Sequence, residues 1–261
     1  MQARRFMLPL LVPMLLVLLS ASGSAQEPII PGGVSPPSEF RFIRMVYSNY
    51  SGFGGFGFRG YGRGSWFTDA PPAEMHLLEG IRRLTRINTS PMGGYLRVMD
   101  DKLFDYPFLY AVEVGHWALS DEEAARLREY LLRGGFLMVD DFWGTEEWEV
   151  FIESMKKVFP DRPIVELDDQ HPIFHVHYEV DHKVQIPGVQ FLRSGHYWEK
   201  DGYVPHWRAI YDDDGRVMVS INFNMDMGDA WEHADNPQYP EPLTTLAYHF
   251  AIDYLLYAMT H

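Results

Sequence analysis

Cysteine is absent from the 261-residue chain. Its absence excludes disulfide bonds, a lipid-anchoring cysteine and a thiol nucleophile. Basic residues are also few: 22 lysines and arginines face 36 aspartates and glutamates, and the formal net charge is −14. Because phosphate contacts need clustered lysine and arginine, we expect no nucleic acid partner. The chain also lacks the GxSxG elbow of serine hydrolases and the HExxH motif of zinc proteases.

The N-terminus has the pattern of a secretory signal peptide. Arg4 and Arg5 precede an apolar run over residues 6–19, and small residues follow up to Ala25. We therefore predict a signal peptide over residues 1–25 and a periplasmic or secreted protein without a membrane span after cleavage. A retained membrane anchor is the alternative, but the apolar run is short and is interrupted by two prolines.

Residues 26–39 are rich in proline and glycine and are predicted to be a linker, which leaves one domain over residues 40–261. Hydrophobic residues make up 46% of the chain, enough for a sizeable core. Residues 51–64 alternate glycine with aromatic residues. This loop lacks the Lys-Ser/Thr of a phosphate-binding loop. It is interpreted either as an insertion that folds over the domain or as a lid whose rings stack on a flat or sugar-like ligand.

The domain is organised around residues 127–144, where a helix ends and a buried strand begins. Ser120 and Glu123 form the pattern of a capping box, which predicts a helix over residues 120–133. Gly134 and Gly135 end this helix. The apolar run 136–139 is too short for a helix and predicts a strand buried on both faces.

Helices and strands alternate along the rest of the domain, which predicts an α/β fold with a mostly parallel sheet and right-handed crossovers. The Asp-Asp-Asp-Gly turn at residues 212–215 predicts an antiparallel hairpin that extends the sheet. The expected strands are 40–48, 95–99, 108–114, 136–139, 163–167, 207–211 and 216–222, and the expected helices are 71–86, 120–133, 146–159 and 242–259.

Polar side chains follow several of these strands, and the carboxyl ends of parallel strands are where such sheets bind ligands. The candidate ligand-binding residues are Asn49, Glu113, Trp143, Asn222, Asn224, Asp226 and Trp231. The candidate acid–base residues are Asp140, Asp141, His116 and Asp229. Alternatively, Asp141 only caps the next helix, and Asp226 and Asp229 only order their own loop.

Adjacent Asp140 and Asp141 point to opposite faces of an extended chain. A hydrolase acting on a carbohydrate would therefore need a carboxylate from another strand end, with Glu113, Asp226 and Asp229 as candidates. Tryptophans near the site, namely Trp117, Trp143 and Trp231, are candidates for a surface on which sugars stack.

His175 and His177 alternate, so their side chains would share one face of a strand at a spacing that metal ligands can have. The remaining spacing matches no known zinc motif. We therefore interpret them as surface or partly buried histidines and predict no metal site, and no cofactor is implied.

Several blocks of the chain together resemble the bacterial domain-of-unknown-function family 4159, over residues 40–261. These blocks are FDYPFLY, LSDEEAARLREYLLRGGFLMVDDFWG, VFPDRPIVELDDQHPIF, PHWRAIYDDDGRVMVSIN and GDAWEHADNPQYPEPLTTLAYHFAIDYLLYAMTH. The resemblance implies a flavodoxin-like three-layer sandwich with helices on both faces, similar to class I glutamine amidotransferase-like domains. The segment from helix to strand also resembles ThuA-like domains, whose members are linked to sugar metabolism.

The family has no established activity. Amidotransferases carry a cysteine in the turn after a central strand, where this chain has Asp140 and Asp141, so glutaminase activity is not expected. The histidine positions of ThuA-like domains correspond here to one of these aspartates and to the segment 222–229. We therefore expect an exported domain that binds a small molecule, a saccharide or an envelope protein at the strand ends. A hydrolase acting on a carbohydrate or cell-wall component is the alternative.

Overall fold

The computed structural model describes residues 38–50 and 64–261. The expected signal peptide, all but the last two residues of the linker and nearly all of the glycine-aromatic loop lie outside the described residues. Within the described part of the chain, no helix is long and apolar enough to cross a membrane.

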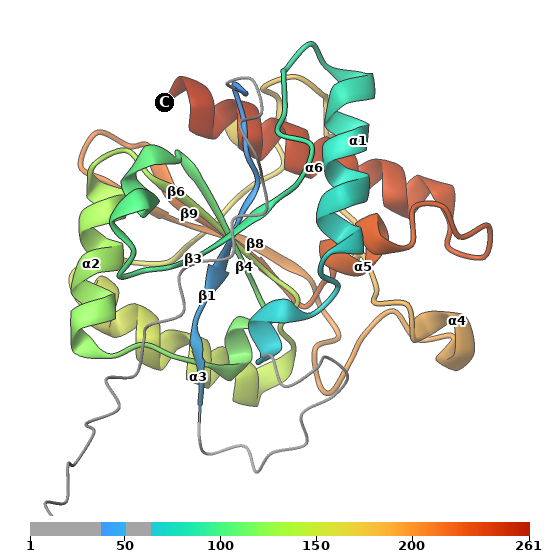
Figure 1. Ribbon diagram of the computed structural model, residues 1–261. Helices are drawn as coiled ribbons and strands as arrows, with labels where there is room; N and C mark the ends of the chain where they lie inside the picture. The colour runs from blue at the N-terminus through green and yellow to red at the C-terminus, as the bar shows by residue number, and fades with distance from the viewer. Residues whose placement is uncertain (1–37, 51–63) are drawn as a thin grey trace, which may run out of the picture.

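A seven-stranded sheet forms the middle layer, in the order β3–β1–β4–β6–β9–β8–β7 (Figure 1). The first five strands in this order run parallel. β8 is antiparallel to both of its neighbours. The strands are β1 (Ile43–Val46), β3 (Gly94–Arg97), β4 (Phe108–Val112), β6 (Phe136–Asp140), β7 (Val165–Glu166), β8 (His206–Tyr211) and β9 (Val217–Phe223). The predicted parallel sheet with an antiparallel hairpin extension is confirmed.

Helices cover both faces of the sheet, which completes a flavodoxin-like three-layer sandwich (Figure 1). One face carries α1 (Pro72–Leu84), α5 (Met227–Glu232) and α6 (Glu241–Thr260), and the other carries α2 (Asp121–Leu132) and α3 (Gly144–Val158). The short helix α4 (Phe191–Ser194) lies in the irregular segment 168–205. The remaining helical turns are the 3₁₀ helices η1 (Ser65–Phe67), η2 (Asp101–Asp105), η3 (Val114–His116) and η4 (Pro172–Phe174).

The central helix and strand form for the reasons that the sequence indicates. Ser120 accepts the N–H of Glu123, and the Glu123 carboxylate accepts the N–H of Ser120, so the capping box is complete. Gly134 follows α2 with φ +105°, a conformation that costs glycine little. Every residue of β6 is buried, as expected for a strand between two helical layers.

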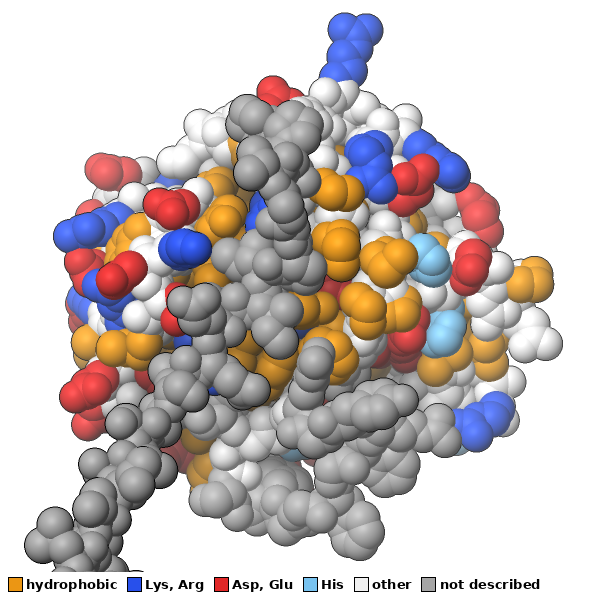
Figure 2. Space-filling view, in the orientation of Figure 1, with side chains coloured by type: hydrophobic (Ala, Val, Ile, Leu, Met, Phe, Trp, Pro, Cys, Tyr) orange, Lys and Arg blue, Asp and Glu red, His pale blue; other side chains and the backbone are white. Residues whose placement is uncertain are grey.

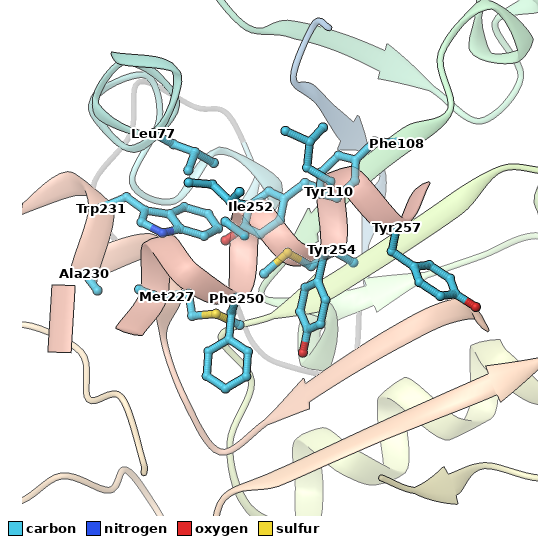
Figure 3. Close-up of a cluster of buried hydrophobic side chains, with 14 of the residues drawn as sticks. Leu77, Phe108, Tyr110, Met227, Ala230, Trp231, Phe250, Ile252, Tyr254 and Tyr257 are labelled. Carbon is cyan, nitrogen blue, oxygen red and sulfur yellow. The ribbon is translucent and has the colours of Figure 1, made fainter. Parts of the chain in front are cut away.

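Aromatic rings dominate the core between the sheet and the helices α1, α5 and α6 (Figure 3). The fully buried Trp231 of α5 lies 5.6 Å from the ring of Tyr110 on β4 and 6.5 Å from that of Phe42. Such ring pairs add roughly 0.5–1.5 kcal/mol each beyond the area that they bury. They hold the short helix α5 against the end of the sheet, where the site described below lies.

Some boundaries differ from the prediction. The expected strand 163–167 is reduced to Val165–Glu166, which pairs with β8 at the outer edge of the sheet. A second, two-stranded sheet of β2 (Ser48–Asn49) and β5 (Trp117–Ala118) was not expected from the sequence. This small sheet joins the chain after β1 to the chain after β4.

Candidate functional site

The strand order creates a crevice at the carboxyl edge of the sheet. From β1 the chain crosses to β3 on one side and then returns to β4 on the other side of β1. Connections leave in opposite directions at such a switch point, and ligands bind there in open α/β sheets. The segments after β1, β4, β6 and β9 all contribute side chains to one pocket at this edge.

The pocket has a volume of about 1110 Å³. Acidic side chains outnumber basic ones among the described residues that line it. The acidic residues are Asp69, Glu113, Asp141, Glu199, Asp226, Asp229 and Glu232, and the basic ones are His116, Lys200 and His233. On the face that Figure 2 shows, Lys and Arg side chains of the described residues lie scattered among acidic ones.

Six of the predicted site residues line this pocket: Glu113, His116, Asp141, Trp143, Asp226 and Asp229. The structure thus brings together residues from the ends of β4, β6 and β9, as the expected parallel sheet implied. The other five do not line the pocket, and each has a structural role instead.

Asp140, one of the predicted acid–base residues, does not line the pocket. It is the last residue of β6 and is fully buried. Its Oδ2 accepts the Tyr110 hydroxyl at 3.1 Å and the N–H groups of Met227 and Gly228 at 2.9 and 3.1 Å. Asp140 therefore holds the start of α5 below the pocket, while Asp141 lines the pocket itself.

The three asparagines were also predicted as ligand-binding residues and instead join elements of the fold. Asn222 donates to the Val139 carbonyl and accepts the Tyr254 hydroxyl, both at 3.0 Å. Asn224 accepts the Gly144 N–H at 2.8 Å.

Asn49 pairs with Ser65 through its amide group. These contacts use the polar atoms that a ligand would need, so neither Asn49 nor the other two asparagines belong to the pocket.

The tryptophans do not form the predicted stacking surface. Trp117 and Trp231 are fully buried core residues, and Trp143 is almost completely buried even though it borders the pocket. A sugar needs a ring face that water can reach, so these three indoles cannot provide it. The sequence indicates that these tryptophans are near the site. It does not indicate which of their rings are exposed, because exposure depends on how the layers pack.

Asp141 does not cap the next helix. Its Oδ1 accepts the indole N–H of Trp143 at 2.8 Å, and the start of α3 is held instead by Glu147, which accepts the Trp143 backbone N–H at 2.5 Å. Asp226 does cap its helix, because its Oδ1 accepts the Asp229 N–H at 2.7 Å. The capping alternative is thus wrong for Asp141, whereas Asp226 orders the start of its own helix and also lines the pocket.

Three carboxylates converge in the pocket from separate segments. Oxygen atoms of Asp69, Asp141 and Asp226 all lie within 4.8 Å of one another. Asp69 was not predicted from the sequence, because it lies between the glycine-aromatic loop and α1 with no motif around it. Its contribution is visible only once the chain before α1 is placed over the carboxyl edge of the sheet.

Burial and mutual repulsion oppose the ionisation of these three groups. Burial raises the pKa of Asp69 well above its usual range, and the charge of Asp229 adds to the effect. Burial and the charges of Glu113 and Asp69 raise the pKa of Asp141 in the same way. The pKa of Asp226 is raised by burial and by Asp141 and Asp229.

Asp229 behaves in the opposite way. Burial opposes its ionisation, but contacts with His233 and the Val189 N–H outweigh burial and lower its pKa. Its Oδ2 accepts that N–H at 2.6 Å, and its Oδ1 lies 3.5 Å from His233 Nε2. The pocket therefore contains carboxyl groups with raised pKa values beside one with a lowered pKa.

A second group of charges lines the wall of the pocket. His116 Nδ1 lies 2.9 Å from Glu113 and its Nε2 3.3 Å from Glu147, which also pairs with Lys200. Burial opposes the protonation of His116, but its bond to Glu113 outweighs this and raises its pKa. A positively charged imidazole between two carboxylates fits this arrangement.

Backbone strain is concentrated at the pocket. Asp69, Glu113 and Asp141 line it with φ values of +62°, +53° and +51°. Such conformations cost non-glycine residues roughly 1–3 kcal/mol each and persist where the fold imposes them, often at functional sites. The backbone thus holds the carboxylates of Asp69, Glu113 and Asp141 at strained turns at the carboxyl edge of the sheet.

The predicted histidine pair lies away from this pocket. His175 Nδ1 binds Glu179 at 2.7 Å and its Nε2 lies 2.8 Å from the Asp169 carbonyl. The backbone N–H of His177 donates to Asp253. The two histidines have separate partners, in agreement with their interpretation as surface or partly buried side chains.

The fold and the pocket define a flavodoxin-like α/β domain with a carboxylate-lined site and no thiol at its switch point. A sequence profile described as Domain of unknown function (DUF4159) matches residues 56–259, and the chain belongs to this family. A search of curated proteins finds no match.

Proposed function

We propose that this protein is an exported domain that binds a small hydroxylated ligand, of the saccharide class, in the pocket at the carboxyl edge of its sheet. The observation that carries the proposal is the convergence of Asp69, Asp141 and Asp226 in this pocket. Carboxylate oxygens accept short, strong hydrogen bonds from hydroxyl groups. Export is inferred from the signal-peptide pattern of residues 1–25.

The size and surroundings of the pocket support a saccharide. Small-molecule sites usually have volumes of about 300–1,000 Å³, and this pocket, at about 1110 Å³, has room for one or two sugar rings. Trp198 and Tyr203 are 38% and 62% exposed, and their rings lie 5.6 Å apart. Trp198 immediately precedes the pocket residues Glu199 and Lys200 in the chain, and we propose that these rings supply the apolar face on which a sugar stacks.

Thermal unfolding and calorimetry with neutral monosaccharides, amino sugars and cell-wall fragments test this proposal. A ligand that binds the folded state raises the melting temperature as its concentration rises. Trp198→Ala should weaken binding, whereas Leu132→Ala, which removes an exposed side chain on α2, should not. If no saccharide raises the melting temperature or gives heat on titration, the proposed function is wrong.

A hydrolase is the second candidate, and it is favoured by the opposed pKa shifts in the pocket. Asp141 has a raised pKa and Asp229 a lowered one. Both residues line the same pocket, and a protonated acid together with an ionised base is the combination that acid–base hydrolysis uses. Release of reducing sugar from cell-wall fragments, lost in both Asp141→Asn and Asp229→Asn, would support this candidate. Saccharide binding without turnover would support the binding domain.

A further inference from the structure

We infer that Asp69, Asp141 and Asp226 together bind a hard divalent cation, with Ca²⁺ as the ion that fits best. The inference rests on the proposed function in one respect, because the cation would lie in the same pocket and would present its free coordination positions to ligand hydroxyls. The residues come from the chain before α1, the turn after β6 and the turn after β9.

Two of the three side chains accept an N–H group through one carboxylate oxygen. Asp141 and Asp226 are only 5% and 3% exposed, and both border the pocket. Each uses its Oδ1 to accept an N–H, from Trp143 and Asp229 respectively. The N–H bonds therefore fall on Oδ1 in both aspartates, and the Asp226 side chain also shares a hydrogen bond with the Asp229 side chain.

The third carboxylate leaves a buried oxygen unsatisfied. Oδ2 of Asp69 is inaccessible to solvent and has no hydrogen-bond partner in the described part of the chain. An acceptor buried in this way normally costs about 1–3 kcal/mol, and a charged one costs more. A cation bound among the three aspartates would satisfy all of these oxygens at once.

Neighbouring cationic side chains are already paired with other carboxylates. The Arg44 guanidinium binds Glu74, and Lys200 binds Glu147. His233 faces Asp229. The charge of Arg44 also acts on Asp69. In the described part of the chain, however, no ion pair joins Asp69, Asp141 or Asp226 to a cationic side chain, so protons or a bound cation balance their remaining negative charge.

Glycines at two positions make room for the carboxylates. A Cβ at Gly228 would collide with Oδ2 of Asp69, and a Cβ at Gly188 would crowd Oδ2 of Asp226. The carboxylate oxygens of Asp69 and Asp226 thus pack directly against these glycines, and any side chain there would push the two carboxylates out of their positions.

The donor set selects the kind of ion. All three donors are carboxylate oxygens, which suit Ca²⁺, Mg²⁺ and Mn²⁺, whereas zinc sites favour nitrogen and sulfur. Ca²⁺ binds oxygens at about 2.3–2.6 Å, so ligands on opposite sides of it lie about 5 Å apart. Donor atoms within 4.8 Å of one another can therefore surround one Ca²⁺. The ion takes 6–8 ligands, so water or ligand hydroxyls would complete its shell.

Isothermal titration of the full chain with Ca²⁺, after EDTA treatment and dialysis, tests this inference. We expect one ion to bind per chain and to raise the melting temperature. Asp69→Asn and Asp141→Asn should each weaken Ca²⁺ binding at least about tenfold, which is 1.4 kcal/mol. Because each replacement also removes like-charge repulsion, the metal-free variants should melt at or above the temperature of the metal-free wild type.

Glu179→Gln is the matched control, because Glu179 belongs to the separate acidic group with His175 and Asp181. It should leave Ca²⁺ binding unchanged. Absence of saturable binding to the wild type overturns the inference. So does binding that survives both Asp69→Asn and Asp141→Asn, or that is lost only in Glu179→Gln.

Saccharide titrations in EDTA and in Ca²⁺ separate this inference from the proposed function. Saccharide binding without any Ca²⁺ binding overturns the cation site and keeps the proposed function. Ca²⁺ binding without any saccharide binding keeps the cation site and overturns the proposed function.

Discussion

Oδ2 of Asp140 accepts the backbone N–H of Gly228 at 3.1 Å and so ties the end of β6 to the start of α5. We expect Asp140→Ala to lower the free energy of unfolding by about 2–4 kcal/mol, because it leaves the Tyr110 hydroxyl and two N–H groups without their acceptor. Asp140→Asn keeps an acceptor oxygen and should cost less. Urea unfolding followed by circular dichroism measures both. Equal losses in the two variants would contradict this role.

The same carboxyl group makes a pH dependence measurable. Burial raises the pKa of Asp140 to about 7, against hydrogen bonds that lower it. The folded state therefore holds a proton that the unfolded state releases near pH 4. Because the folded state binds this proton more tightly than the unfolded state, the contribution of Asp140 to the free energy of unfolding is greatest below pH 4. It falls as the pH rises towards 7. The total change is up to about 4 kcal/mol for Asp140, and Asp69, Asp141 and Asp226 act in the same direction.

Urea unfolding of the wild type and of Asp140→Asn between pH 4 and pH 8 tests this dependence. The variant carries no ionisable group at this position, so its stability should fall less steeply over that range than that of the wild type. The difference between the two proteins isolates Asp140 from the other carboxyl groups. Parallel pH profiles would show that Asp140 ionises normally in the folded state.

Sequence periodicity predicted the roles of Asp140 and Asp141 only in part. Alternation along an extended chain indicated that they face opposite sides, and the parallel sheet indicated that Glu113 and Asp226 lie near Asp141. Which of the two aspartates enters the pocket depends on which helical layer packs on each face, and that is a tertiary property. Asp69 had no local signal, since its position depends on how the chain before α1 returns to the sheet.

A buried ion pair positions that returning segment. The guanidinium of Arg44 on β1 binds Glu74 on α1, and its NH1 donates to the Thr68 carbonyl at 2.6 Å, one residue before Asp69. Both side chains are buried, so removal of one partner should cost about 3–5 kcal/mol, because the other charge is left unpaired. We therefore expect Glu74→Ala to be strongly destabilising.

A double-mutant cycle checks this expectation. Arg44→Met combined with Glu74→Leu should be less destabilising than the sum of the two single variants, because no unpaired charge remains. The exposed pair Arg83 and Glu79 serves as the control, and Arg83→Ala should cost no more than about 1 kcal/mol. Additive losses at the buried pair would show that the two side chains do not depend on each other.

Gly228 allows the pocket and the stability of the fold to be separated. Gly228 lies in the first turn of α5, and alanine is favoured over glycine in helices by about 1 kcal/mol, so the stability of Gly228→Ala should change little. The new Cβ would displace the Asp69 carboxylate, so Ca²⁺ binding should fall. Gly134→Ala is the opposite control: its φ of +105° predicts a loss of stability, but no atom of the pocket lies near it. Calorimetry measures the Ca²⁺ affinity of both variants, and urea unfolding measures their free energy of unfolding. Unchanged Ca²⁺ affinity in Gly228→Ala would mean that Asp69 does not bind the ion.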